Sequence, residues 1–281
     1  RALEQFKRAA DLNYPLANWA VGLLFAKGQG TPINLAEANS WYRKAAEHGI
    51  AIAQGSLGYN LENGLGVSKD ETEAVKWYRK AAEQGLAPSQ DSLGLMYIRG
   101  QGIDKNYDEA MKWFRKAAEQ GFAPAQSNLG AMFANGHGTS KNETEAVKWY
   151  QKAAEQGNAK AQDNLGLMYI NGRGIAKSDD EAMNWFRKAA EQGLASAQSN
   201  LGAMYATGRG TSKNETEAVK WYRKAAEQGN SKAQYNLGSM YATGRGVDKD
   251  EAEALKWYRK AAEQGNSVAE AAMRKLAPVS N

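Results

Sequence analysis

The amino-acid sequence predicts an all-α protein, an α-solenoid of tandem 36-residue helix-turn-helix repeats. The first observation is the string WYRKAAEQG or a close variant, whose tryptophan returns every 36 residues, at Trp41, Trp77, Trp113, Trp149, Trp185, Trp221 and Trp257. The other two are a helix start signal before each string and a recurring Gly-x-Gly turn. Because a unit this short buries its apolar face only by stacking on its neighbours, the repeats predict a solenoid.

The first helix of each repeat begins at a residue whose short side chain can cap the first turn. These residues are Asn34, Asp70, Asn106, Asn142, Ser178, Asn214 and Asp250. A glutamate stands three residues later in every copy, as Glu73 does after Asp70, and completes the pattern of a capping box. The helix then ends at a glycine such as Gly85, which enters the left-handed conformation without a Cβ clash.

The residues between these two signals predict an amphipathic helix. In the repeat that starts at Asp70, one arc of the helical wheel holds Ala74, Val75, Trp77, Tyr78, Ala81 and Ala82, and the other holds Lys76, Arg79, Lys80 and Glu83. We expect the aromatic pair to form the core between repeats and the alanine pair to let a neighbouring helix approach. The tryptophan is therefore interpreted as a core residue.

A second helix is predicted from roughly Ser89 to Arg99, and its apolar arc is wide. Four of its positions recur in later copies as Leu, Gly, Met and Tyr or Phe: Leu93, Gly94, Met96 and Tyr97. Glycine in the middle of a helix costs about 1 kcal/mol relative to alanine, so we expect another group to approach Gly94 closely. The Gly-x-Gly turn then ends the helix and leads to the next capping residue.

The organisation predicts one domain, a single solenoid over residues 1–276 with about eight repeats. The first repeat is truncated, because the first seven residues match only the middle of a repeat helix, as a truncation or a processing scar would leave them. The last helix is a C-terminal cap, because Arg274 stands one period after Gly238 and prevents a further helix from packing there. Residues 277–281 form a tail.

The composition excludes some classes of protein. No run of 18 or more apolar residues occurs, so no membrane span is predicted. The absence of cysteine excludes disulfides and thiolate chemistry and fits a reducing or an oxidising compartment equally well. The 36 Lys and Arg against 31 Asp and Glu give a net charge of only +5, which is small for a nucleic-acid-binding polycation but favours acidic partners mildly.

The motifs resemble those of the Sel-one-like repeat (SLR) family, whose arrays are related to tetratricopeptide repeats. The first part of the family pattern fits Ala74, Trp77, Tyr78, Lys80, Ala81, Ala82, Glu83 and Gly85. The second part fits Gln90, Leu93, Gly94, Met96, Tyr97, Gly100 and Gly102. The resemblance covers nearly all of residues 1–276, and the 36-residue period with its Gly-x-Gly turn favours this family over ordinary tetratricopeptide arrays of about 34 residues.

The resemblance implies a right-handed superhelix of helix pairs that serves as an adaptor. Members of the family are known among bacterial secreted or periplasmic proteins, host-interaction factors and eukaryotic quality-control subunits, and some bacterial members resemble immunity proteins that sequester a toxic lipase. A periplasmic or secreted bacterial location is therefore slightly favoured over the cytoplasm. One branch of the family has paired cysteines and is reported to bind penicillin. The properties of that branch are not carried over to this chain, because this chain has no cysteine.

Motifs for catalysis, cofactors and metals were tested and rejected. The Gly-x-Gly-x-x-Lys run at Gly100 and Lys105 follows a helix, and Asn106 already caps the amides that a phosphate would need. Neither Gly-x-Ser-x-Gly nor Ser-x-x-Lys occurs, so the motifs of an acyl-transfer nucleophile are missing. The two histidines, His48 and His137, stand in different repeats, and no metal site or cofactor is predicted.

A calcium loop is rejected as well. Asp248, Asp250 and Glu253 look faintly like one, but they lack the glycine at its sixth position.

Basic residues recur on the polar arc of the first helix and predict a binding surface. The predicted partner-binding residues are Lys76, Arg79, Lys112, Arg115, Lys148, Arg187, Lys220, Arg223, Lys256 and Arg259. Stacking of the repeats should align them into ladders, with a gap in the middle where Gln151 and Asn184 replace an arginine and a lysine. The alternative is that these charges only pair with nearby glutamates, such as Glu83, on a solvated helix face.

We expect a protein-interaction scaffold that holds an acidic segment of a protein partner, because repeats offer extended area and no assembled catalytic group. In related arrays the first helices line the concave side, so by analogy the ladders should face the groove. A monomer is expected, and the resemblance suggests a bacterial host-interaction or toxin-immunity factor. The alternative is a binder of nucleic acid or another polyanion.

An enzyme is not expected. It would need residues that break the repeat, and Trp19, Tyr107, His137 and Tyr235 have no partner in the sequence that would make them catalytic.

Overall fold

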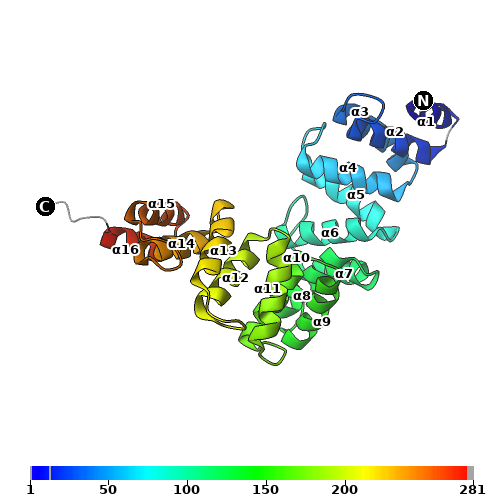
Figure 1. Cartoon of the computed structure of the whole chain (residues 1–281). Helices are drawn as coiled ribbons and strands as arrows, with labels where there is room; N and C mark the ends of the chain where they lie inside the picture. Colours follow the sequence, from blue (N-terminus) through cyan, green and yellow to red (C-terminus); the bar gives the residue numbers. More distant parts are fainter. Residues whose placement is uncertain (1, 13, 277–281) are drawn as a thin grey trace. The chain divides into compact units, whose positions relative to one another are not determined.

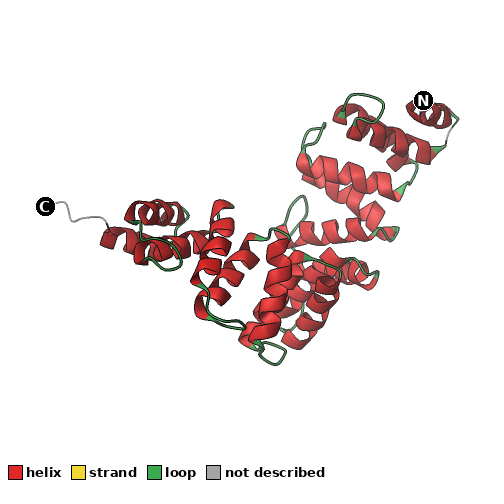
Figure 2. Ribbon diagram, in the orientation of Figure 1, coloured by secondary structure: helices red, strands yellow, loops and turns green. Residues whose placement is uncertain are grey.

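The computed structural model describes residues 2–12 and 14–276, and the regular elements throughout these ranges are helices (Figure 1, Figure 2). The predicted all-α repeat fold is confirmed. The predicted tail at 277–281 lies outside the described residues.

The chain divides into two compact units, Arg1–Asn142 and Glu143–Asn281. Unit 1 holds α1(Ala2–Asp11), α2(Pro15–Lys27), α3(Leu35–Glu47), α4(Ala51–Asn63), α5(Glu71–Glu83), α6(Ala87–Arg99), α7(Tyr107–Glu119) and α8(Ala123–Asn135). Unit 2 holds α9(Glu143–Glu155), α10(Ala159–Asn171), α11(Asp179–Glu191), α12(Ala195–Thr207), α13(Glu215–Glu227), α14(Ser231–Thr243), α15(Glu251–Ala262) and α16(Ser267–Leu276). Each unit is a stack of helix pairs, and the single solenoid over 1–276 stays a prediction.

Two kinds of helix alternate within each unit. From α3 on, the odd-numbered helices carry the WYRKAAE string or a close variant of it. An even-numbered helix packs against the odd-numbered helices before and after it where both belong to its unit, as α4 packs against α3 and α5. The expected core is confirmed in α5, where Trp77 and Tyr78 are buried. The close approach expected at Gly94 is also confirmed, because a Cβ there would lie 2.7 Å from Cε1 of Phe114 in α7.

The start signals of the odd-numbered helices are only partly as predicted. The capping side chain accepts the backbone N–H three residues later at 2.8–3.2 Å at Asn34, Asp70, Asn106, Ser178, Asn214 and Asp250. The capping box also implies a second bond, in which the glutamate side chain accepts the N–H of the capping residue, and this part of the prediction was wrong. The N–H of Asp70 donates instead to the carbonyl of Leu61 at 3.0 Å, because the turn brings the end of the preceding helix within reach.

The glutamate side chains bind other partners. Glu73 accepts hydrogen bonds from Arg43 at 2.7 Å and from the indole N–H of Trp77 at 3.1 Å. The bond from Arg43 is the main reason that the pKa of Glu73 is lowered.

A buried glutamine near the start of the even-numbered helices ties three helices together. In α6, Gln90 donates from Nε2 to the carbonyl of Ala82 in α5 at 3.0 Å, and its Oε1 accepts from Gln120 at the end of α7 at 2.8 Å. The glutamine–glutamine bond recurs between Gln54 and Gln84, Gln162 and Gln192, Gln198 and Gln228, and Gln234 and Gln264. These bonds link neighbouring repeats within each unit.

The Gly-x-Gly turn fixes each repeat against the one before it. A Cβ at Gly102 would overlap the carbonyl group of Glu71 at the start of α5, so the second glycine is required by close packing. The residue between the glycines reaches the same place, since Gln101 donates to the carboxylate of Glu71 at 3.2 Å. In unit 2 an arginine takes this role in three ion pairs: Arg173 with Glu143, Arg209 with Asp179, and Arg245 with Glu215.

Candidate interaction surface

The ten predicted partner-binding residues lie on the odd-numbered helices of both units. Unit 1 carries Lys76 and Arg79 on α5 and Lys112 and Arg115 on α7. Unit 2 carries Lys148 on α9, Arg187 on α11, Lys220 and Arg223 on α13, and Lys256 and Arg259 on α15. All are exposed except Arg79, which is half-buried. We call these residues the basic face of each unit; their role in binding stays a prediction.

Aromatic rings of the following helix hold four of the arginines in place. Arg79 donates to the hydroxyl of Tyr97 at 2.8 Å, and Arg223 donates to that of Tyr241 at 2.7 Å. Arg187 makes the same bond to Tyr205 at 3.2 Å, while the guanidinium of Arg115 lies 5.7 Å from the ring centroid of Phe133. Since a guanidinium has five N–H donors, one such bond orients it and leaves further donors for an anion.

Four of the five lysines of the basic face are paired with the glutamate three residues before them. Lys112 lies 2.6 Å from Glu109, and the same pairing joins Lys148 to Glu145, Lys220 to Glu217 and Lys256 to Glu253. The hydrogen bond that Lys112 donates to Glu109 raises the pKa of Lys112. Because exposed pairs of this kind contribute only about 0–1 kcal/mol, a partner can displace them at little cost.

A second row of lysines was missed by the sequence reasoning. The ammonium group three residues after each tryptophan lies 4.1–4.7 Å from an indole ring centroid, in Lys44, Lys80, Lys116, Lys152, Lys188, Lys224 and Lys260. The signal was present in the sequence as Trp-x-x-Lys in all seven strings. Residues three apart on a helix share a face, so a cation–π contact was predictable.

The indole N–H groups beneath this face are unevenly satisfied. Trp41 donates to Glu37 at 2.9 Å and Trp77 to Glu73, but the buried Nε1 atoms of Trp113, Trp149 and Trp257 have no hydrogen-bond partner. The reason is local, because the glutamate four residues earlier has turned to the lysine of the ion pair instead. A buried donor without a partner costs about 1–3 kcal/mol.

The basic face is hollowed in both units. In unit 1 a hollow of about 590 Å³ is lined by Lys112, Arg115 and Lys116 together with Asp108 and Glu119. In unit 2 a hollow of about 280 Å³ is lined by Lys148, Lys152 and Trp149 together with Glu145 and Glu155. Each hollow therefore combines cations with carboxylates beside its apolar surface.

The residues that break the repeat are used in packing. The rings of Tyr107 and His137 stack at a centroid distance of 4.4 Å, and Tyr235 packs against Tyr258 at 5.7 Å. Across the described residues, no group of three or more His, Cys, Asp or Glu is arranged to hold a metal ion. Nor is any of the helices described long and apolar enough to cross a bilayer.

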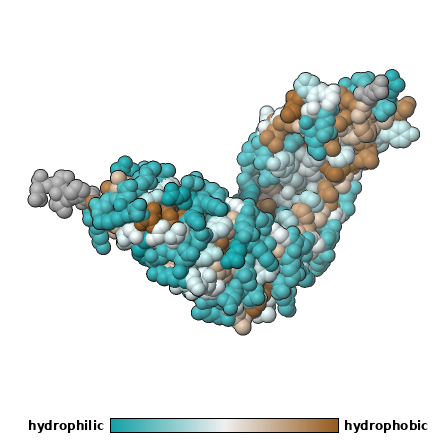
Figure 3. Space-filling model, in the orientation of Figure 1, coloured by the Kyte–Doolittle hydropathy of each residue, from teal (hydrophilic) through white to brown (hydrophobic). Residues whose placement is uncertain are grey.

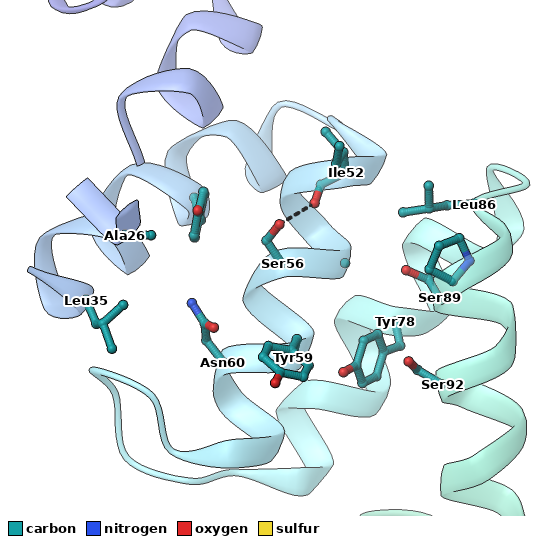
Figure 4. A pocket seen from close by; sticks show the side chains of 13 residues that line it. Ala26, Leu35, Ile52, Ser56, Tyr59, Asn60, Tyr78, Leu86, Ser89 and Ser92 are labelled. Carbon is teal, nitrogen blue, oxygen red and sulfur yellow. Dashed lines mark hydrogen bonds between the residues drawn. The ribbon is translucent and has the colours of Figure 1, made fainter. Parts of the chain in front are cut away.

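An apolar pocket lies elsewhere, among the helices of unit 1, and the sequence reasoning did not predict it. Its volume is about 440 Å³, and its walls come mainly from α4 and α6 with Tyr78 of α5 (Figure 4). Large exposed apolar side chains are concentrated in the same unit: Phe6, Leu12, Tyr14, Leu16, Ile33, Ile52 and Tyr59, against Leu167 and Val268 in unit 2. Figure 3 shows the brown, apolar surface of unit 1.

The comparison with known proteins identifies the same repeat. The family model described as Sel1 repeat matches seven consecutive segments: residues 15–50, 51–86, 87–122, 123–158, 159–194, 195–230 and 231–266. Each segment begins with an even-numbered helix and ends after the next odd-numbered one. No curated protein matches the chain significantly.

Solved structures with SLR folds are similar over most of the chain. A protective antigen from uropathogenic Escherichia coli strains is 40% identical with a TM-score of 0.82, and the match covers 96% of this chain and 58% of that protein. A Sel1 repeat protein from Oxalobacter formigenes is 33% identical with a TM-score of 0.78, covering 98% of this chain and 80% of the other. An immunity protein from Pseudomonas aeruginosa, 22% identical with a TM-score of 0.51 over 76% and 81% of the chains, shares the fold alone.

Proposed function

The chain belongs to the Sel1 repeat family, whose members are generally protein-interaction scaffolds, and on that premise we propose that it binds an acidic segment of a protein partner on its basic face. The observation that carries the proposal is the set of arginines oriented by the next helix, exemplified by Arg223 on Tyr241. Oriented guanidinium groups suit carboxylates, because the side-chain entropy is already lost before binding.

The other features of the basic face support the same occupant. In the hollow of unit 2, a carboxylate can replace Glu145 as the partner of Lys148. The concave placement of this face and a monomeric state are part of the proposal by analogy with related arrays.

For the biological setting we propose a bacterial host-interaction factor. What supports it is the likeness to the protective antigen of uropathogenic Escherichia coli, of whose length this chain spans 58%. A toxin-immunity role is the weaker alternative, because this chain shares only the fold with the Pseudomonas immunity protein.

The test uses a fluorescein-labelled poly-glutamate peptide and a DNA duplex of similar charge, both titrated with the full chain at rising salt. The double charge reversal Lys220→Glu with Arg223→Glu should lower peptide affinity about tenfold, by replacing attraction with repulsion. The matched control is Lys160→Glu with Lys232→Glu, which changes the net charge equally but lies on α10 and α14.

Two results would count against the proposal. Equal losses for both double variants would mean that only net charge matters. Stronger binding of the duplex, with a steep linear fall of log affinity against log salt, would favour the polyanion alternative.

A further inference from the structure

The pocket between α4 and α6 exists because one repeat departs from the pattern of the others. At the position of Gly55 the later repeats carry Asp91, Ser127, Asp163, Ser199 and Tyr235. At the position of Ser92 they carry Asn128, Asn164, Asn200 and Asn236. Gly55 is also the one glycine of α4 outside the repeated glycine positions, so a side chain is missing here that the other repeats possess.

In two other repeats the missing side chains close the groove between neighbouring even-numbered helices. Asn128 of α8 donates to the carboxylate of Asp91 in α6 at 2.8 Å. In unit 2, Asn200 donates to Asp163 at 2.8 Å, and Ser196 donates to the same carboxylate at 2.7 Å. With glycine and serine in place of this pair, the groove between α4 and α6 stays open.

The open groove has an apolar lining. None of the residues that line it is charged, and its walls include Ile52, Tyr59, Leu86 and Pro88. Ile52 is 41% exposed and Tyr59 is 54% exposed, which is high for side chains of this size. Figure 4 shows the rings of Tyr59 and Tyr78 at the same end of the pocket, with Ser92 beside Tyr78.

Several polar groups around the pocket are already satisfied within the protein. Ser56 donates to the carbonyl of Ile52 at 2.8 Å, and Asn60 donates to Asn39 at 2.7 Å. The hydroxyl of Tyr78 donates to Glu62 at 2.8 Å, and Glu62 is also 3.8 Å from Arg99. Because the charges nearby are paired with each other, a charged or strongly polar occupant gains nothing there, whereas an apolar one recovers exposed surface.

We propose that this pocket is a second binding site, which receives bulky apolar side chains from an uncharged peptide segment of a protein partner. The site is independent of the basic face, because none of its lining residues belongs to that face and its main walls have few charges: α4 has only Glu62, and α6 has only Asp91 and Arg99. Exposed apolar patches of this kind mark interaction sites in proteins. Binding here is expected to be insensitive to salt, unlike binding on the basic face.

The experiment closes the pocket with the protein's own pattern. The variant Gly55→Asp with Ser92→Asn restores the pair that seals the next groove. A third change, Ser89→Ala, makes room, because a Cβ at position 55 would lie 2.7 Å from Oγ of Ser89. The other full repeats have alanine at this position, as in Ala53 and Ala125. Circular dichroism and the urea midpoint should show that this triple variant folds as the parent does.

The probe is a neutral peptide of Gly, Ser and Gln with a central Leu-Phe pair, and its control has Ala-Ala at the centre. Titration of ¹⁵N-labelled full chain should shift the amide signals of Gly55, Leu86 and Ser92 with the first peptide and not with the second. The triple variant should lose about tenfold or more in affinity. The double variant Lys220→Glu with Arg223→Glu should bind this peptide normally, so failure of one proposal is distinguishable from failure of the other.

Other outcomes overturn the proposal. Undiminished binding to the triple variant, or equal binding of the Ala-Ala peptide, would mean that the pocket is not the site. Saturable shifts at Gly55 and Ser92 with free cyclohexanol but none with the peptide would assign the pocket to a small apolar molecule. Self-association of the parent in sedimentation, abolished in the triple variant, would assign it to a second copy of the chain.

Discussion

Replacing Gln198 by alanine tests whether the buried glutamines hold neighbouring repeats together. Gln198 is 4% exposed. Its Nε2 donates to the carbonyl of Ala190 in α11 at 3.2 Å, and its Oε1 accepts from Gln228 at the end of α13 at 2.8 Å. The truncation removes both bonds, and each is worth about 0.5–1.5 kcal/mol. The carbonyl of Ala190 keeps the backbone N–H of Gly193 at 3.0 Å, so we expect a loss of about 1–3 kcal/mol and no more.

The assay is urea unfolding followed by circular dichroism, with hydrogen exchange of the amides in α11, α12 and α13. Gln228→Ala should cost only about 1 kcal/mol, because it removes one of the two bonds of Gln198 and because Gln228 itself is exposed. The double variant should show a coupling free energy of about 1 kcal/mol. Gln198→Met keeps the shape of the side chain and should cost nearly as much as alanine. Full additivity of the two single losses, or a harmless methionine, would show that packing and not the glutamine bond joins the repeats.

Two further predictions concern packing and charge in unit 2. Gly166→Ala places a Cβ 2.6 Å from Cε1 of Phe186 and should destabilise by about 1–3 kcal/mol, and Phe186→Leu in the same chain should restore part of the loss in urea unfolding. An alanine at Gly166 that leaves the midpoint unchanged would contradict the close packing. Burial raises the pKa of Asp163, so the folded state holds the proton of this carboxyl more tightly than the unfolded state does. The stabilisation that the protonated carboxyl gives at low pH is therefore lost as the pH rises from about 3.8 through the raised pKa. Asp163→Asn should therefore stabilise the protein at neutral pH and flatten that part of the curve of stability against pH. If the Asn variant were less stable than the parent at pH 7, the hydrogen bonds from Ser196 and Asn200 would contribute more than the cost of burying the charged carboxylate.

The sequence predicted the periodic features because they depend on neighbours at fixed spacing. The capping residue Asp70, the buried Trp77 and Tyr78, and the packed Gly94 all follow from helical periodicity and glycine geometry. The return bond of the capping box was wrong because local spacing does not reveal that a carbonyl of the preceding helix, at Leu61, reaches the N–H of Asp70 first. A single sequence shows that two groups can meet, but the tertiary contact decides which pair forms.

The candidate surfaces illustrate the same limit. The basic residues were predictable as a repeated row, whereas their orientation by rings 18 residues later, as with Arg79 and Tyr97, depends on how one helix packs on the next. The apolar pocket could not be predicted for the opposite reason, because it arises from one departure from the repeat. The effect of Gly55 on the groove becomes clear only when the structure shows Asp91 closing the next groove.

A repeated fold gives this chain two surfaces with different physical chemistry. The odd-numbered helices hold most of the charge, as in α5 with three glutamates, two lysines and one arginine, while α8 and α12 carry no charged side chain. On the two proposals above, association on the first surface would be governed by ion pairs that salt screens, and association on the second by apolar burial that salt does not weaken. Departures from the repeat would then decide where a partner binds: Gln151 and Asn184 interrupt the basic residues, and Gly55 opens the uncharged layer at one groove. A partner that uses both surfaces would need an acidic segment and an uncharged apolar one, and its affinity would fall with salt only to the level that the apolar segment alone maintains.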